Sequence, residues 1–166
     1  DVLVINAGGE PLYGDSADGD FSRFASQIER QLAGTHRLAS GFLPHMSDRG
    51  SGAVIGIGSV FSEGVPPVGM TPYVVAKSAL TAYLKCLAVE YGPKGIRCNI
   101  VSPGITETSV AANIPDRQRK VAAAQTPLRR LAMPEDIANA VAYLASPEAG
   151  FVSGHTLTVS GGVNMK

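Results

Sequence analysis

TPYVVAKSALTAYLKCLAVEYGP, residues 71–93, has the pattern of one long helix. Thr71 can cap the first turn with its hydroxyl, and Pro72 suits the first helical position because no hydrogen bond is lost there. Gly92 followed by Pro93 predicts the end of the helix, with Gly92 in a left-handed conformation. Apolar residues recur at three- and four-residue spacing, namely Ala76, Ala79, Leu80, Tyr83, Leu84 and Leu87. Much of the remaining helix surface is apolar too, which indicates cover on more than one side.

Tyr73 and Lys77 are one turn apart at the start of this helix and therefore share a face. A free phenol has a pKa of about 10 and exchanges protons poorly at neutral pH. A nearby ammonium favours the phenolate, so we expect Lys77 to lower the pKa of Tyr73. A tuned phenol can protonate an alkoxide as it forms on a carbonyl, or remove the proton in reverse. The alternative interpretation is a tyrosine and a lysine at a helix start with no chemistry.

The composition suits one α/β domain. The chain has 166 residues, 45% of them hydrophobic, and its 14 basic residues balance 14 acidic ones. Because the formal net charge is zero, neither nucleic acid nor an anionic membrane surface is an expected partner. Cys86 and Cys98 have no metal-ligand spacing, so no metal site is predicted and buried thiols are the default. No apolar run reaches the length of a membrane span, and a cytoplasmic location is expected.

Short apolar runs alternate with helical patterns along the chain. Strands are predicted at residues 2–5, 53–57, 96–101 and 156–159, the third broken by Ser102-Pro103-Gly104. A helix over 21–47, with Pro44 predicting a kink or an early end, carries a periodic apolar set: Phe21, Phe24, Ile28, Leu32, Leu38, Phe42, Leu43 and Met46. A last helix runs from Pro134 to about Ser146. Alternating strands and helices predict a doubly wound, mainly parallel sheet.

Two irregular segments are candidates for substrate recognition. Residues 60–70 predict a surface loop, and residues 105–133 predict a loop with a short helix that forms a mobile lid. Val65, Pro66, Pro67, Val68 and Met70 indicate an apolar lining in the first segment. Arg129 and Arg130 in the second are candidates for an acidic carrier or a phosphate, although exposed arginines are more often simply solvated.

The carboxyl ends of the predicted strands carry the remaining candidates. Asn6-Ala7-Gly8 follows the first strand, Ser59 the second and Pro103-Gly104 the third. Ligands of parallel α/β sheets bind beyond these ends. Strand topology therefore gathers a hydroxyl, a phenol, an ammonium and a glycine-rich turn at one edge of the sheet.

These motifs together resemble those of the short-chain dehydrogenase/reductase family, and most closely its 3-oxoacyl-acyl-carrier-protein reductases. The matching elements are Asn-Ala-Gly after a strand, Gly-Ser at the end of the next, Tyr-x-x-x-Lys, Asn99 with Ser102-Pro103-Gly104, and a C-terminal Gly-Gly pair. Each motif is weak alone, but their order and spacing run through the whole chain. The resemblance implies a Rossmann-like fold and oxidoreductase activity with NAD or NADP.

The resemblance also implies roles for individual residues. Tyr73 would be the general acid/base, Lys77 would lower its pKa and hold the nicotinamide ribose, and Ser59 would polarise the substrate carbonyl. Ser62 is a rival to Ser59, three residues further into the loop. The cofactor would be lined by residues at the strand ends: Asn6, Ala7, Gly8, Tyr73, Lys77, Pro103, Gly104, Thr106 and Thr108.

Gln31 is a departure from the family pattern. It occupies the position that matches the family's relay asparagine in the long middle helix. A longer amide can still hold a water molecule, but in a different place. We therefore expect any proton relay through Gln31 to differ from that of the family.

The family's glycine-rich phosphate loop is not in this sequence. By comparison, the 166 residues match only strands four to seven of the family's sheet, and roughly 80 residues of preceding βα units are missing. NAD and NADP are not distinguished, because the discriminating residue would lie there. The first strand would then expose an unpaired edge, which indicates a fragment or a second polypeptide partner.

Two function classes follow from the resemblance. The first is an NAD(P)(H)-dependent oxidoreductase that transfers a hydride between nicotinamide and a carbonyl or secondary alcohol. The second is a catalytically silent half-domain that acts as an oligomerisation or binding module. In either case the resemblance implies a homodimer or homotetramer through helices 21–47 and 73–91. The substrate stays open among a fatty-acyl thioester, a polyketide or sterol-like ketone, and a sugar.

Overall fold

A computed structural model describes residues 1–165 and contains one parallel sheet in the order β1-β2-β3-β4. The strands are β1 (Val2–Ile5), β2 (Gly52–Ile57), β3 (Ile96–Pro103) and β4 (Thr156–Val159). The helices are α1 (Phe21–Arg49), α2 (Thr71–Tyr91), α3 (Asp116–Gln125) and α4 (Pro134–Ala145). The four strands are parallel throughout, as predicted.

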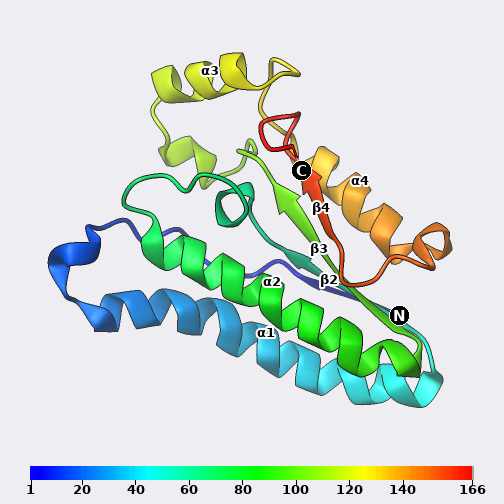
Figure 1. Ribbon diagram of the computed structural model, residues 1–166. Helices are drawn as coiled ribbons and strands as arrows, with labels where there is room; N and C mark the ends of the chain where they lie inside the picture. Colours follow the sequence, from blue (N-terminus) through cyan, green and yellow to red (C-terminus); the bar gives the residue numbers. More distant parts are fainter. Residues whose placement is uncertain (166) are drawn as a thin grey trace.

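Helices cover both faces of the sheet (Figure 1). α1 and α2 lie side by side on one face, above a core centred on Val54, Leu80, Leu84 and Ile100. α4 packs on the other face, where Leu144 meets Ile55 and Val101. α3 lies beyond the carboxyl ends of β3 and β4. The doubly wound prediction is confirmed.

The bounds of α2 agree with the prediction, but the caps at its ends differ. The N-cap is Met70, and the Thr71 hydroxyl instead pairs with the Ser16 hydroxyl at 2.9 Å. Pro72 lies in the first turn, as predicted. Gly92 is right-handed, with φ −52°, because a 3₁₀ turn over Gly92–Lys94 continues the chain. Gly95 takes the left-handed conformation, at φ +74°.

α1 buries Leu43 and Met46 as predicted, but its N-terminal half buries a polar stripe. Its inward residues recur mostly at four-residue spacing: Gln27, Gln31, Thr35, Ala39, Leu43 and Met46. Phe21, Leu38 and Phe42 are instead exposed. Pro44 does not end the helix, which continues to Arg49 and closes on left-handed Gly50. Asp20 caps the other end, and its carboxylate accepts from the backbone N–H groups of Ser22 and Arg23.

β3 is longer than predicted, because Ser102 and Pro103 still pair with β4. Proline is tolerated there since it is the last residue of the strand. Arg97 of β3 ties down the C-terminal connection, and its guanidinium donates to the carbonyls of Leu144, Ser146 and Val152. No helix within residues 1–165 has the length and apolar character needed to cross a membrane.

Candidate active site

Ser59 and Tyr73 meet where β2 ends and α2 begins. Ser59 is 5% exposed and caps the 3₁₀ turn over Val60–Ser62, with Phe61 N–H donating to its Oγ at 3.3 Å. Its hydroxyl also hydrogen-bonds the Tyr73 phenol. The Ser62 hydroxyl instead donates to the Ser59 carbonyl at 2.6 Å. The structure thus brings Ser59, rather than Ser62, to the phenol.

The pKa of Tyr73 is raised, so the expectation that it is lowered is wrong for this structure. Burial of the phenol is the main cause, and the hydrogen bond with Ser59 opposes it. The Lys77 ammonium lies 5.9 Å from the centre of the Tyr73 ring, and it donates to the Ile57 carbonyl at 2.8 Å. Desolvation therefore sets the direction of the shift, and Tyr73 is protonated at neutral pH.

Lys77 is buried, with 6% of its surface exposed. Burial disfavours its charged form and lowers its pKa to about 8. Because this pKa lies below that of an unfolded lysine, the unfolded chain holds more protons between about pH 8 and pH 10.5. Charged Lys77 therefore opposes folding by about 3 kcal/mol below pH 8, and the penalty is relieved as the pH rises.

We expect Lys77→Met to reveal this penalty. Urea unfolding at pH 7.5 and pH 10 should show the free energy of unfolding of the unmodified chain rising by about 2 kcal/mol relative to the variant. Lys85→Met is the matched control, because Lys85 lies on the same helix and is exposed. If the free energy of unfolding changes with pH in the same way for the Lys77 and Lys85 variants, the lowered pKa of Lys77 is contradicted.

Gly8, Gln31 and Lys77 fit tightly together. A Cβ on Gly8 would lie 2.3 Å from Gln31 Oε1 and 3.3 Å from Lys77 Nζ. Gln31 is 1% exposed, and its amide nitrogen donates to the Ala7 carbonyl at 3.3 Å. The Gln31 carbonyl accepts the Thr35 hydroxyl at 2.6 Å. The Gln31 amide is thus bound directly to the loop after β1, and its part in a proton relay stays a prediction.

Gln27 is a site residue that the sequence did not reveal. It is buried one turn before Gln31, accepts from Leu12 N–H at 2.8 Å and donates to the Gly8 carbonyl at 3.5 Å. The two glutamines therefore hold residues 7–12 against α1. Gln27, Gln31 and Thr35 are spaced four residues apart, and this spacing could have indicated a buried polar stripe on α1. Buried polar side chains need hydrogen-bond partners, which the loop after β1 supplies.

The other predicted cofactor residues line the same edge. Asn6 and Ala7 are exposed, and Pro103 and Gly104 lie at the end of β3. The Thr106 hydroxyl donates to the Gly104 carbonyl at 3.0 Å, and Thr108 is exposed with its hydroxyl 3.4 Å from the Thr106 carbonyl. Asn99 lies apart from this edge.

Asn99 has a structural position. Its amide donates to the Val152 carbonyl at 2.8 Å, and its oxygen accepts from His155 N–H at 3.0 Å. It is buried within β3 and bound at both ends of its amide. The asparagine of the motif therefore anchors the segment that leads into β4.

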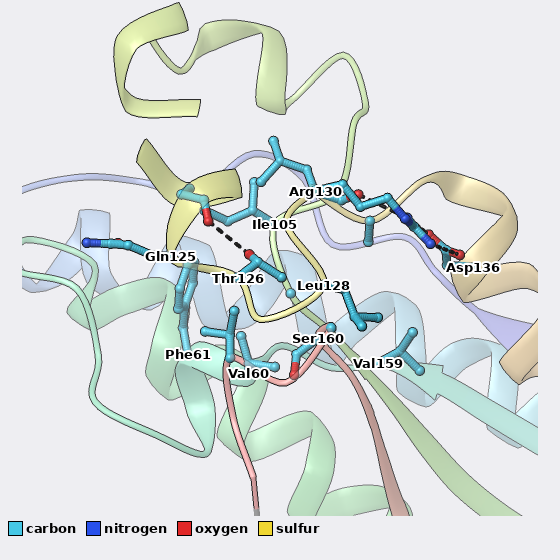
Figure 2. A pocket seen from close by; sticks show the side chains of 16 residues that line it. Val60, Phe61, Ile105, Gln125, Thr126, Leu128, Arg130, Asp136, Val159 and Ser160 are labelled. Carbon is cyan, nitrogen blue, oxygen red and sulfur yellow. Dashed lines mark hydrogen bonds and ion pairs between the residues drawn. The ribbon is translucent and has the colours of Figure 1, made fainter. Parts of the chain in front are cut away.

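An apolar cavity of about 280 Å³ lies on the Ser59 side of the site (Figure 2). It joins the two segments predicted to determine specificity, because Val60 and Phe61 face Ile105 and Leu128 across it. Val65 and Val68, predicted to line the substrate site, are instead fully solvent-exposed. Of the predicted apolar set, Met70 is buried.

The two arginines of the second segment bind within the chain. Arg130 forms an ion pair with Asp136 at the edge of the cavity, at 2.9 Å between Nη2 and Oδ1. Arg129 donates to the Ala124 carbonyl at 2.5 Å. These contacts favour structural roles for both guanidinium groups.

Comparison with known proteins decides the family. A family model described as enoyl-(acyl carrier protein) reductase matches residues 1–164. A solved structure of a short chain dehydrogenase/reductase family protein is 39% identical, with a TM-score of 0.87 over 98% of this chain and 66% of that one. The chain belongs to the short-chain dehydrogenase/reductase family. The fold and the order of the motifs in this short-chain dehydrogenase/reductase chain agree with that membership.

Two relatives illustrate the range of the family. Cis-4-hydroxycyclohexanecarboxylate dehydrogenase of Sinomonas cyclohexanicum is 38% identical over 98% of this chain, which spans 65% of that relative's length. The 3-oxoacyl-[acyl-carrier-protein] reductase FabG of Escherichia coli is also 38% identical, over 99% of this chain and 67% of the relative. A crystal structure of 7 alpha-hydroxysteroid dehydrogenase complexed with NADH and 7-oxo glycochenodeoxycholic acid superposes with a TM-score of 0.89 at 35% identity, over 98% of this chain and 63% of that one.

Proposed function

We propose that the natural protein is an NAD(P)(H)-dependent oxidoreductase that interconverts a carbonyl compound and a secondary alcohol. The observation that carries the proposal is the hydrogen bond between Ser59 and the protonated phenol of Tyr73, with the buried Lys77 one turn further along α2. Because the Ser59 hydroxyl and the Tyr73 phenol lie within hydrogen-bond distance of each other, both can donate to the oxygen of one substrate carbonyl. The dehydrogenase and reductase relatives support the same class of reaction.

The residues divide the work in the reduction direction. Ser59 donates a hydrogen bond to the substrate oxygen and so stabilises the charge that develops on it. Tyr73, protonated at neutral pH because its pKa is raised, gives its proton to that oxygen. Lys77, with a pKa of about 8, remains mainly cationic at pH 7 and stabilises the phenolate left behind. A nicotinamide nucleotide, when bound, supplies the hydride to the carbon.

The strand-end residues fit a nicotinamide nucleotide. Gly8 packs against the Gln31 amide close to the Lys77 ammonium, so any larger side chain there would displace Gln31 from this edge of the site. The Lys77 ammonium has donors beyond the one given to Ile57, and these suit ribose hydroxyls. Pro103, Gly104, Thr106 and Thr108 would hold the nicotinamide and pyrophosphate end, and Asn6 and Ala7 the adenosine side.

Deuterium transfer tests the proposal. The natural protein, given NADH or NADPH deuterated at the transferable position and a panel of ketones, should place deuterium on the carbinol carbon of the product. The ratio of kcat/KM for the two cofactors assigns NAD or NADP. Absence of labelled product with both cofactors across the panel would contradict an oxidoreductase and favour the binding-module alternative.

We also propose that the protein forms a homodimer or homotetramer through α1 and α2. Leu38 and Phe42 of α1 are 38% and 48% exposed, and Val75 and Val89 of α2 are exposed as well. Apolar side chains of this size on two adjacent helices suit burial against a second copy. A cytoplasmic location, with no nucleic acid or membrane partner, is consistent with the balanced charge of the chain.

A further inference from the structure

Residues 12–16, here called the strap, cross the start of α2 next to Tyr73. Gln27 accepts from Leu12 N–H, and Arg23 donates to the Tyr13 carbonyl. Gly14 N–H donates to the Gly69 carbonyl at 3.0 Å, and Ser16 shares a hydrogen bond with Thr71. The strap is therefore bound to α1 on one side and to the residues just before Tyr73 on the other.

A second cavity, of about 360 Å³, lies under this strap on the Tyr73 side of the site. Its walls include the rings of Tyr13, Phe21, Phe24 and Pro72, and Pro72 is the residue before Tyr73. Tyr13 is 56% exposed although it stands on a strap held at both ends. An exposed ring on a fixed backbone is suited to contact with a ligand.

Tyr13 is also within electrostatic reach of the reacting phenol. The electrostatic effect of the Tyr13 side chain contributes to the raised pKa of Tyr73, after the larger effect of burial. The two phenols therefore lie in one neighbourhood, although 60 positions separate them in the sequence, counted as 73 minus 13. A substrate whose carbonyl binds Tyr73 has the Tyr13 ring close to its remaining atoms.

We propose that Tyr13 is a specificity-determining residue for the reaction assigned to Tyr73. Its ring, with Phe24 and Pro72, takes an apolar ring or similarly compact body that the substrate carries beyond its carbonyl. The substrate class is an uncharged or cationic cyclic ketone or alcohol. This assignment rests on the proposed function, which supplies the carbonyl chemistry at Tyr73.

The charges around the cavity disfavour anionic substrates. Asp15, Asp18 and Asp20 face it against the single guanidinium of Arg23, which leaves a net of two negative charges. At about 8 Å in water, one unit charge changes affinity by about twofold. Two such charges disfavour a carboxylate or phosphate by about fivefold at low ionic strength, and salt weakens the effect.

Matched probes test the assignment on the natural protein. Methyl 4-oxocyclohexanecarboxylate and the free carboxylate share one ring and differ in charge. At low salt we expect the ester to bind about fivefold more tightly, measured by calorimetry, and Asp18→Asn to reduce this preference about twofold. Equal affinity, or tighter binding of the carboxylate, would overturn the charge assignment.

Tyr13→Ala and Tyr13→Phe test the ring contact. Loss of the ring should weaken ester binding and raise KM by about tenfold, with kcat for a small acyclic ketone within twofold of the unmodified protein. Tyr13→Phe should retain most of the affinity. Tyr143→Ala, at an exposed position on α4, is the control. Unchanged ester affinity in Tyr13→Ala would overturn the proposal.

The binding readout keeps the two proposals separate. A protein that binds the ester through Tyr13 but transfers no deuterium to any ketone contradicts the oxidoreductase assignment alone. A protein whose Tyr13→Ala variant reduces the cyclic keto ester as efficiently as the unmodified protein contradicts the specificity assignment alone.

Discussion

Tyr73→Phe should reduce kcat for ketone reduction by between about a hundredfold and ten-thousandfold, because the variant keeps the ring and loses the only proton that Tyr73 can give. KM should change little, since Ser59 still hydrogen-bonds the carbonyl oxygen. The fold should persist, because the change removes one hydrogen bond with Ser59, worth about 1 kcal/mol. Steady-state kinetics and thermal unfolding of the natural protein measure both effects.

Tyr143→Phe is the matched control for this experiment. Tyr143 is an exposed tyrosine on α4, on the opposite face of the sheet from α2. Its variant should keep full activity. Retained turnover in Tyr73→Phe would remove Tyr73 from the proposed mechanism, whatever the control shows.

Gly95→Ala should be the most destabilising single methyl addition at the turn before β3. Gly95 has φ +74°, and a Cβ there would lie 2.1 Å from the Gly50 carbonyl oxygen. The left-handed conformation alone costs an alanine about 1–2 kcal/mol. The overlap with backbone adds to this, because the turn after α1 must move. We expect a loss of about 3 kcal/mol or more, measured by urea unfolding.

Gly92→Ala, three residues earlier, provides the internal comparison. Gly92 is right-handed, and a Cβ there meets no atom within 4 Å. An alanine at such a position restricts the unfolded chain and stabilises by about 0.4–1 kcal/mol. Unfolding of the two alanine variants at the same urea concentration would contradict the close contact between the turns at Gly95 and Gly50.

The sequence predicted the elements well where local patterns and burial agree. The run that ends in Asn6-Ala7-Gly8 and the helix that begins at Thr71 lie where they were expected. Parallel strands place their carboxyl ends together, so the meeting of Ser59 with Tyr73 followed from topology. The bounds of α2 agree with the prediction, but Gly92 is right-handed because a 3₁₀ turn follows it. β3 extends beyond its predicted end because Pro103 pairs with β4.

Hydrophobicity predicted the burial of Leu43 and Met46 on the inward face of α1, but not that of the polar residues in its N-terminal half. Gln27 and Gln31 are buried because the loop after β1 offers carbonyl and N–H partners to their amides. Those partners are distant in sequence, so the apolar pattern of Phe21, Leu38 and Phe42 wrongly suggested a core face. The predicted lowering of the Tyr73 pKa was wrong for a related reason, because the burial that raises this pKa depends on residues distant in the sequence.

The hydrogen bonds of Arg97 and Asn99 affect how cooperatively the chain unfolds. From the central strand β3 they bind the carbonyls of Leu144, Ser146 and Val152 and the N–H of His155, so the connection between α4 and β4 is fastened to the middle of the sheet. A loop held in this way cannot open without leaving a guanidinium and an amide unpaired in the protein interior. Residues 144–155 therefore unfold with the sheet as one unit, and their backbone amides exchange with solvent water only when the sheet itself opens.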